Sequence, residues 1–191
     1  RNRFLPFIEL ICERLDILQL ASVVDYRLER MLGMRVYHYP ADQSARTSLD
    51  RYFSELAAGR VLEIEKIEVK GRTIRVPAAA GIARKKFADL CGQPLGAADY
   101  LAIAERYHTL ILDDIPRMGE EKQSEARRFV TLIDALYEAK VNLICSADAP
   151  PKELYLTGEG AFEFERLVSR LMEMQSADYL ALPHGKGDLV D

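Results

Sequence analysis

Two neighbouring carboxylates follow a short apolar run in the middle of the chain. Asp113 and Asp114 come directly after residues 110–112, which are Leu-Ile-Leu. Carboxylates at the end of a buried strand can hold Mg²⁺ and orient a water molecule in phosphoryl transfer. The same residues can instead end a strand, because Asp caps the turn that follows. Both interpretations stay open, since the sequence contains no GxxxxGK[ST] phosphate-binding loop.

Polar residues also follow the next apolar run, residues 141–145. Ser146 and Asp148 stand where a strand would end, so they could sense a phosphate group or simply form strand-end hydrogen bonds. Two arginines offer a third candidate, because Arg166 and Arg170 are four residues apart and share one helix face. They could stabilise charge on a transferring phosphate or belong to an ion-paired, solvated face.

Composition narrows the function classes. The 191 residues are 49% apolar, which predicts a folded core, and the net charge of -4 gives no global attraction to nucleic acid or anionic lipid, although it allows a local basic patch. No apolar stretch approaches the roughly 20 residues of a membrane span. We expect buried, reduced cysteines and no metal site, from the surroundings and spacing of Cys12, Cys91, Cys145, His38, His108 and His184.

Periodicity predicts mixed structure in the first half of the chain. Apolar spacing favours a helix over 4–14 and another over 43–57, and short strands over 15–20 and 35–40. Residues 61–77 alternate apolar and charged side chains around the turn sequence VKGRT, which predicts a β-hairpin with one solvated face.

The second half alternates helices and buried strands. The pattern predicts, in order, helix 94–107, strand 108–114, helix 120–140, strand 141–148 and helix 162–180. Such a run builds a parallel α/β layer with right-handed crossovers. The predicted fold class is therefore α/β, with a parallel-sheet unit, flanking helices and a small antiparallel hairpin.

Several long strings resemble the ZapE-like cell-division ATPases, the family of the yeast protein called ATPase family gene 1. They are RNRFLPFIELI, VDYRLER, FADLCGQPLGAADYLAIAERYHTLILDDIPRM, EARRFVTLIDALYEAKVNLICSAD and FEFERLVSRLMEMQSADYL. The resemblance covers roughly residues 1–180. It implies an AAA+-related P-loop fold in which the phosphate loop and the magnesium-binding acids precede the segment RFLPFI.

The resemblance implies that this chain corresponds to the C-terminal portion of such an ATPase. We therefore expect ATP and Mg²⁺ as cofactors of the intact protein and none bound by this chain alone. The implied segments are 1–40 (end of the ATPase core), 41–93 (helix and hairpin), 94–180 (C-terminal α/β unit) and 181–191 (flexible tail).

The resemblance also implies roles for residues near the start of the chain. Arg1 and Arg3 match the position of an arginine finger, a catalytic role, and Asp25 with Arg27 matches a sensor-type nucleotide contact. Because the family's magnesium-binding acids lie ahead of this segment, the strand-end interpretation of Asp113 is favoured.

The resemblance implies ATP hydrolysis in bacterial cell division. The expected partners are division-ring or inner-membrane proteins and further copies of the protein, with no nucleic acid. The expected location is the cytoplasm, at the inner face of the membrane. The alternative is a non-catalytic α/β interaction module that binds a partner through its hairpin or its last helix, where Met172, Met174 and Tyr179 offer an adaptable surface.

Overall fold

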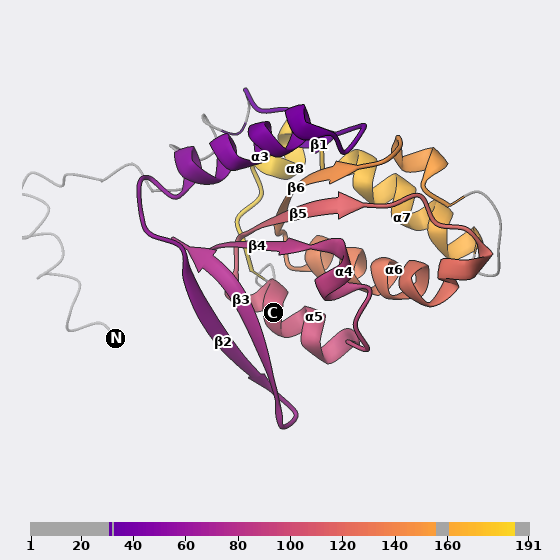
Figure 1. Ribbon diagram of the computed structural model, residues 1–191, viewed down its shortest axis with the longest axis horizontal. Helices are drawn as coiled ribbons and strands as arrows, with labels where there is room; N and C mark the ends of the chain where they lie inside the picture. The colour runs from indigo at the N-terminus through magenta and orange to yellow at the C-terminus, as the bar shows by residue number, and fades with distance from the viewer. Residues whose placement is uncertain (1–30, 32, 156–160, 186–191) are drawn as a thin grey trace, which may run out of the picture.

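The computed structural model describes Met31, residues 33–155 and residues 161–185. One six-stranded sheet, in the order β1-β6-β5-β4-β3-β2, runs through these residues (Figure 1). Its strands are β1 (Tyr37–His38), β2 (Glu63–Val69), β3 (Arg72–Ala79), β4 (Ile82–Lys86), β5 (Thr109–Ile115) and β6 (Asn142–Ala147). Strands β1, β6, β5 and β4 are parallel, and β3 and β2 follow as antiparallel strands. The predicted α/β fold class with its hairpin is confirmed.

Helices cover both faces of the sheet. One face carries α3 (Gln43–Leu56), and the other carries α4 (Phe87–Leu90), α5 (Ala97–Arg106), α6 (Gln123–Glu138) and α7 (Ala161–Glu173) (Figure 1). The short elements are α8 (Ala177–Leu180) and the 3-10 helices η1 (Glu120–Lys122) and η2 (Pro151–Glu153). None of these described helices combines the length and apolarity needed to cross a bilayer.

The structure corrects two predicted helices and adds one strand that was not predicted. The helix expected to begin near Pro94 begins at Ala97, after Gly96 as its N-cap. The helix expected over 162–180 is interrupted, and Ser176 caps the new helix α8 by accepting a hydrogen bond from the N–H of Tyr179 at 3.1 Å. Strand β4 was not predicted at all. The expected elements at 4–14 and 15–20 lie outside the described residues.

The hairpin forms as predicted, and its turn explains why. Lys70 and Gly71 both have positive φ, 47° and 78°, which is the backbone of a type I′ turn that matches the twist of two paired strands. Along β2 and β3, Ile67 and Ile74 face the core while their neighbours are exposed. The hairpin was expected to be the one antiparallel feature, but β3 also pairs antiparallel with β4.

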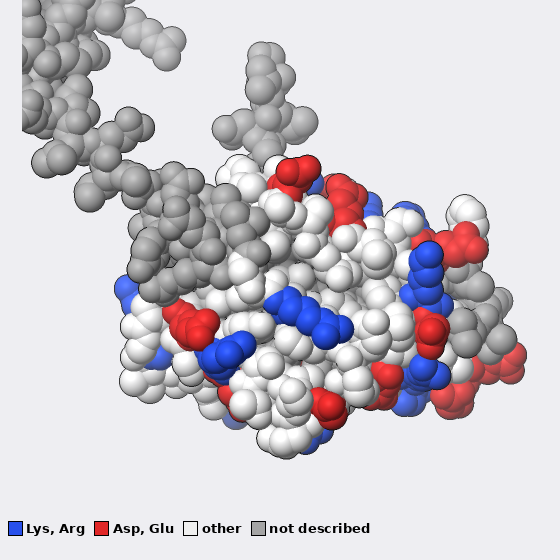
Figure 2. All heavy atoms as spheres, turned by 90° about the horizontal axis from the view of Figure 1, so that it is seen from above, with Lys and Arg blue, Asp and Glu red and all other residues white. Residues whose placement is uncertain are grey.

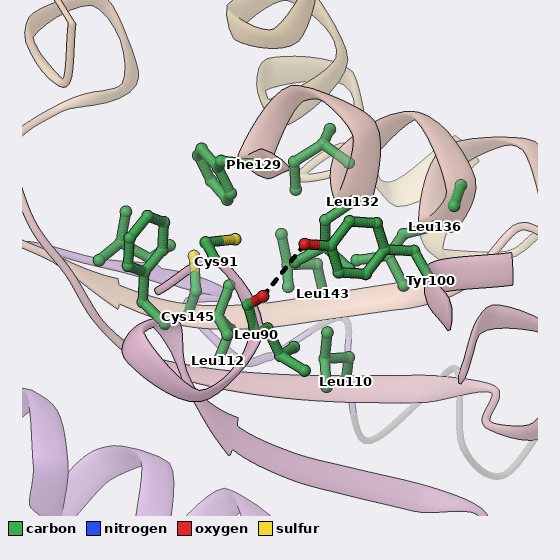
Figure 3. Packing of buried hydrophobic residues seen from close by; sticks show 14 of the residues in the cluster. Leu90, Cys91, Tyr100, Leu110, Leu112, Phe129, Leu132, Leu136, Leu143 and Cys145 are labelled. Carbon is green, nitrogen blue, oxygen red and sulfur yellow. Dashed lines mark hydrogen bonds between the residues drawn. The ribbon is translucent and has the colours of Figure 1, made fainter. Parts of the chain in front are cut away.

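Two apolar clusters lie on opposite faces of the sheet. The larger one packs α4 to α7 against β5 and β6, and Leu110, Phe129 and Leu143 lie within it (Figure 3). The fully buried Tyr100 donates a hydrogen bond to the carbonyl of Leu90 at 3.0 Å, so its hydroxyl is satisfied inside this cluster. The smaller cluster lies between α3 and the other face.

Cys91 and Cys145 belong to the larger cluster as free, buried thiols (Figure 3). Burial raises the pKa of both thiols well above the ordinary value. They are therefore held as unreactive thiols, as their apolar sequence surroundings predicted. Cys12 lies outside the described residues.

Segment boundaries predicted at 1–40, 41–93, 94–180 and 181–191 stay a prediction. The sheet takes β1 from the first segment, β2, β3 and β4 from the second, and β5 and β6 from the third. These three segments therefore share main-chain hydrogen bonds.

A buried carboxylate ties the hairpin to α5. Asp99 is fully buried, and its Oδ2 accepts hydrogen bonds from the N–H of Gly96 at 2.8 Å and from Nη2 of Arg72 at 3.0 Å. Arg72 also donates to the carbonyl of Pro94 at 3.2 Å. The other oxygen of Asp99, Oδ1, is buried with no hydrogen-bond partner among the described residues. Arg72 is therefore the cation that makes this burial tolerable.

We expect the substitution Arg72→Met to lower the free energy of unfolding by about 1–3 kcal/mol, because it leaves a buried carboxylate without its cation. Urea unfolding followed by circular dichroism measures the change. The matched control is Arg75→Met on the same strand, where an exposed arginine should contribute less than about 0.5 kcal/mol. Equal losses in the two variants would contradict the role given to Arg72.

Candidate functional site

Polar side chains gather at the carboxyl ends of the parallel strands, beneath α3. Ile111 and Ile144 pack under α3 against Leu49. Because side chains alternate along a strand, Asp113 and Ser146, two residues further on, face the same side. We call the set the carboxyl-edge cluster: His38, Arg84, Asp113, Asp114 and Ser146 from the sheet, with Arg46 and Asp50 from α3. Open α/β sheets bind ligands at this edge, which makes it the first place to look for a site.

Arg84 is the central cation of the carboxyl-edge cluster. Its Nε and Nη2 donate to the two oxygens of Asp113, at 2.9 and 3.0 Å, in a bidentate pair. Its Nη1 donates to Oδ1 of Asp50 on α3 at 2.6 Å. These hydrogen bonds, that with Asp113 first, raise the pKa of the guanidinium. The side chain of Asp113 is only 10% exposed. Arg84 therefore binds both of its oxygens where little water can reach them.

Asp114 interrupts the regular ladder. Its φ is 62°, a left-handed conformation that is uncommon outside glycine, and the pairing of β5 with β6 shifts register between Leu112 and Ile115. Its N–H turns to Oγ of the buried Ser146 at 2.9 Å, and its carboxylate accepts from Arg46 of α3 at 3.3 Å. Ser146 therefore stabilises the backbone of the bulge, and Arg46 binds the carboxylate of Asp114.

His38 reaches the same edge from the other side. In the parallel pairing of β1 with β6 it lies opposite Ser146, and its ring packs against Tyr52 of α3 with the ring centroids 5.7 Å apart. Its Nε2 is buried and has no hydrogen-bond partner among the described residues. Burial lowers the pKa of this histidine, so the neutral ring is the favoured form.

Asp113 is not free to bind the Mg²⁺ of an ATP complex. The described residues contain no group of three or more His, Cys, Asp or Glu side chains placed to hold a metal ion. Both oxygens of Asp113 are already engaged by Arg84. A magnesium ion would have to displace a bidentate guanidinium. The geometry agrees with the strand-end interpretation of Asp113 and Asp114.

Arg166 and Arg170 lie on α7, which packs on the face of the sheet opposite α3 and lies against α6 (Figure 1). Both donate to the carboxylate of Asp134, and Arg170 also donates to Glu138 at 2.9 Å. The guanidinium of Arg170 lies over the ring of Tyr137, 4.6 Å from its centroid. These contacts describe an ion-paired helix face, which is one of the two interpretations left open by the sequence.

The remaining residues singled out in the sequence lie outside the carboxyl-edge cluster or outside the described residues. Asp148 is exposed, and its N–H donates to the carbonyl of Ile115 at 2.8 Å, a strand-end contact. Outside the described residues lie Arg1, Arg3, Asp25 and Arg27, the positions with implied catalytic and nucleotide roles. Met174 and Tyr179, considered as an adaptable surface, are buried core residues, while Met172 is exposed.

Sequence reasoning missed Arg84, Arg46, Asp50 and His38 as members of the cluster. Arg84 was missed with its strand, because the sequence IARKK shows no alternation of apolar and polar residues. His38 was assessed only for metal-ligand spacing. Its neighbour Ser146 is 108 residues away in sequence, and only the β1–β6 pairing brings the two together.

Comparison with known proteins gives a consistent result over the whole chain. A sequence model described as AFG1-like ATPase matches residues 1–183. The chain is 35% identical to the cell division protein ZapE of Escherichia coli (strain K12), over 98% of this chain and 50% of that protein. It is 34% identical to lactation elevated protein 1 homolog B of Danio rerio, over 94% of this chain and 43% of that protein. The chain spans about half the length of the curated relatives it matches, and no solved structure matches it.

We expect Arg84→Met to lower the free energy of unfolding by about 2–3 kcal/mol, because Asp113 is then left buried without a cation. The double variant Arg84→Met/Asp113→Leu should recover part of this loss, since no buried charge remains. The control Asp50→Ala removes an exposed partner and should cost about 1 kcal/mol or less. Urea unfolding measures the stability of all three variants. An Arg84→Met protein as stable as the parent would refute the stabilising role given to the bidentate Arg84–Asp113 pair.

The burial of His38 leads us to expect that the folded protein loses stability on mild acidification. Its pKa is lowered in the folded state, so below its ordinary value of about 6.5 the unfolded chain binds the proton more readily. This contribution to stability is complete above that pH and is lost as the pH falls towards the folded-state pKa. In His38→Phe, the difference in urea midpoint between pH 7.5 and pH 5.5 (about one unit either side of the ordinary pKa) should shrink. A difference in urea midpoint as large in His38→Phe as in the parent would contradict the assignment.

Proposed function

This chain belongs to the AFG1-like ATPase family, and we propose that it forms part of an enzyme that hydrolyses ATP and acts in bacterial cell division. The supporting observation is the agreement between the family match and the ZapE similarity over nearly the whole chain. ATP and Mg²⁺ are the cofactors of this enzyme. Its place of action is the cytoplasm, at the inner face of the membrane.

This chain does not itself supply the groups that bind the phosphates of the nucleotide. A P-loop enzyme holds its phosphates with backbone amides and a lysine, and this sequence has no GxxxxGK[ST] loop to supply them. The carboxyl-edge cluster is closed by the contacts of Arg84. The described α/β unit therefore serves as the platform that follows the functional segment at residues 1–30.

Within that segment we assign arginine fingers to Arg1 and Arg3 and a sensor-type contact to Asp25 and Arg27. An arginine that reaches a neighbouring subunit stabilises the charge that develops on the transferring phosphoryl group. Self-association of the enzyme would bring these arginines to the next copy's nucleotide. Division-ring or inner-membrane proteins are the partners on which the machine acts.

We expect Arg1→Ala or Arg3→Ala to lower kcat for ATP hydrolysis by about 10³-fold, the effect of losing an arginine finger. The measurement is phosphate release by an enzyme that contains this chain together with a phosphate-binding loop. The control Arg117→Ala removes an exposed arginine paired with Glu153 and should leave kcat unchanged. Wild-type kcat in both finger variants would remove the assignment.

A further inference from the structure

The hairpin of β2 and β3 projects from the body of the protein, beyond the helices that cover the rest of the sheet (Figure 1). Its inner face packs against α5 through Ile67 and Ile74, which belong to the larger cluster. We define its outer face as Ile64, Lys66 and Glu68 on β2 and Thr73, Arg75 and Pro77 on β3. The helix α3 covers the same side of the sheet, but its main contacts are with β5 and β6, so no described helix is packed over this outer face.

Exposed aliphatic side chains concentrate at the base of the hairpin. Val61 is 80% exposed and Ile64 65%, and Leu62 between them is also exposed. The structure's other large exposed apolar residues are dispersed along the chain. Single exposed apolar residues need no explanation, but three within four positions form a patch that points to a contact. On the outer face this patch continues from Ile64 to the opposing Pro77.

Two cations lie next to that apolar patch in an unfavourable arrangement. Lys66 and Arg75 are directly opposite each other in the β2–β3 ladder, and both are exposed. Like charges in opposing positions of an antiparallel pair destabilise it. Among the described residues neither forms an ion pair, and Glu68, the one carboxylate of this face, accepts a hydrogen bond from Thr73 at 2.7 Å. An edge lysine alone would discourage strand pairing, but Arg75 lies on β3, which is not an edge strand.

We propose that the outer face of the hairpin, with Val61 and Leu62, docks on an anionic phospholipid bilayer. Aliphatic side chains that protrude from a convex surface can enter the interfacial layer, and lysine and arginine beside them pair with lipid phosphates. An anionic surface also relieves the repulsion between Lys66 and Arg75.

Other classes of anionic partner fit less well. Nucleic-acid surfaces use aromatic side chains for stacking, and the outer face has none. On the side of the molecule seen in Figure 2, basic and acidic side chains are interspersed, so that side carries no extended field of one sign. The attraction is therefore local to the hairpin and depends on the apolar contact as well as on charge.

The test is co-sedimentation of the 191-residue chain with phosphatidylcholine vesicles, with and without phosphatidylglycerol. We expect binding to the anionic vesicles, weakened by added salt, and little to the neutral ones. Lys66→Glu/Arg75→Glu should weaken binding by about 25-fold or more, and Ile64→Ser by about tenfold. The matched controls Lys122→Glu/Lys152→Glu on η1 and η2 and Leu101→Ser on α5 should bind as the parent does.

Circular dichroism establishes that each variant is folded. The proposal is overturned if the parent does not bind anionic vesicles, if it binds neutral vesicles equally well, or if the hairpin variants and the controls bind alike. The assay contains no nucleotide, so its outcome is independent of whether the protein takes part in ATP hydrolysis.

Discussion

The Arg84 guanidinium holds the sheet and α3 together at the carboxyl edge. It neutralises a nearly buried carboxylate on β5 and at the same time binds Asp50 on α3. Neither contact would suffice alone, because a buried Asp113 without a cation is costly and an exposed ion pair to Asp50 contributes little. Together they place α3 over the strand ends, where Arg46 adds a second contact to Asp114. These polar contacts add to the apolar packing of Leu49 against Ile111 and Ile144, which also holds α3 on this face of the sheet.

This arrangement closes the edge at which α/β sheets commonly bind ligands. The strained backbone at Asp114, a bulge next to two carboxylates, has the local features of an active site. Its contacts are nevertheless internal, because Ser146 takes the freed N–H and arginines take the carboxylates. The strand therefore resembles a phosphate-handling strand in its architecture, while its two carboxylates are engaged by arginines of this chain.

Much of this fold follows from local pattern. Strands β5 and β6 are apolar on both faces, so their burial and parallel pairing were predictable, and the hairpin follows from alternation and a turn that accepts positive φ. Strand β4 was not, because three of its five residues are basic. Because β4 was not predicted, Arg84 was not recognised as the partner of Asp113, and the burial of Asp113 could not be explained from the sequence. The proximity of His38 to Ser146 could not be inferred either, since the pairing of β1 with β6 joins distant parts of the chain.

The two edges of the sheet differ in a way that bears on where partners can bind. Strand β1 has only two residues, and Nε of Arg35 donates to the carbonyl of Tyr37 at 2.9 Å, so a main-chain acceptor there is already occupied. A two-residue edge strand with one acceptor already occupied offers few main-chain groups to another chain. Strand β2 at the opposite edge has seven residues and belongs to a hairpin that projects from the body. Contacts with other molecules are therefore favoured at the β2 end of the sheet. The longer edge strand, the exposed aliphatic side chains and the cations Lys66 and Arg75, unpaired within the part of the chain that the structure describes, occur together there.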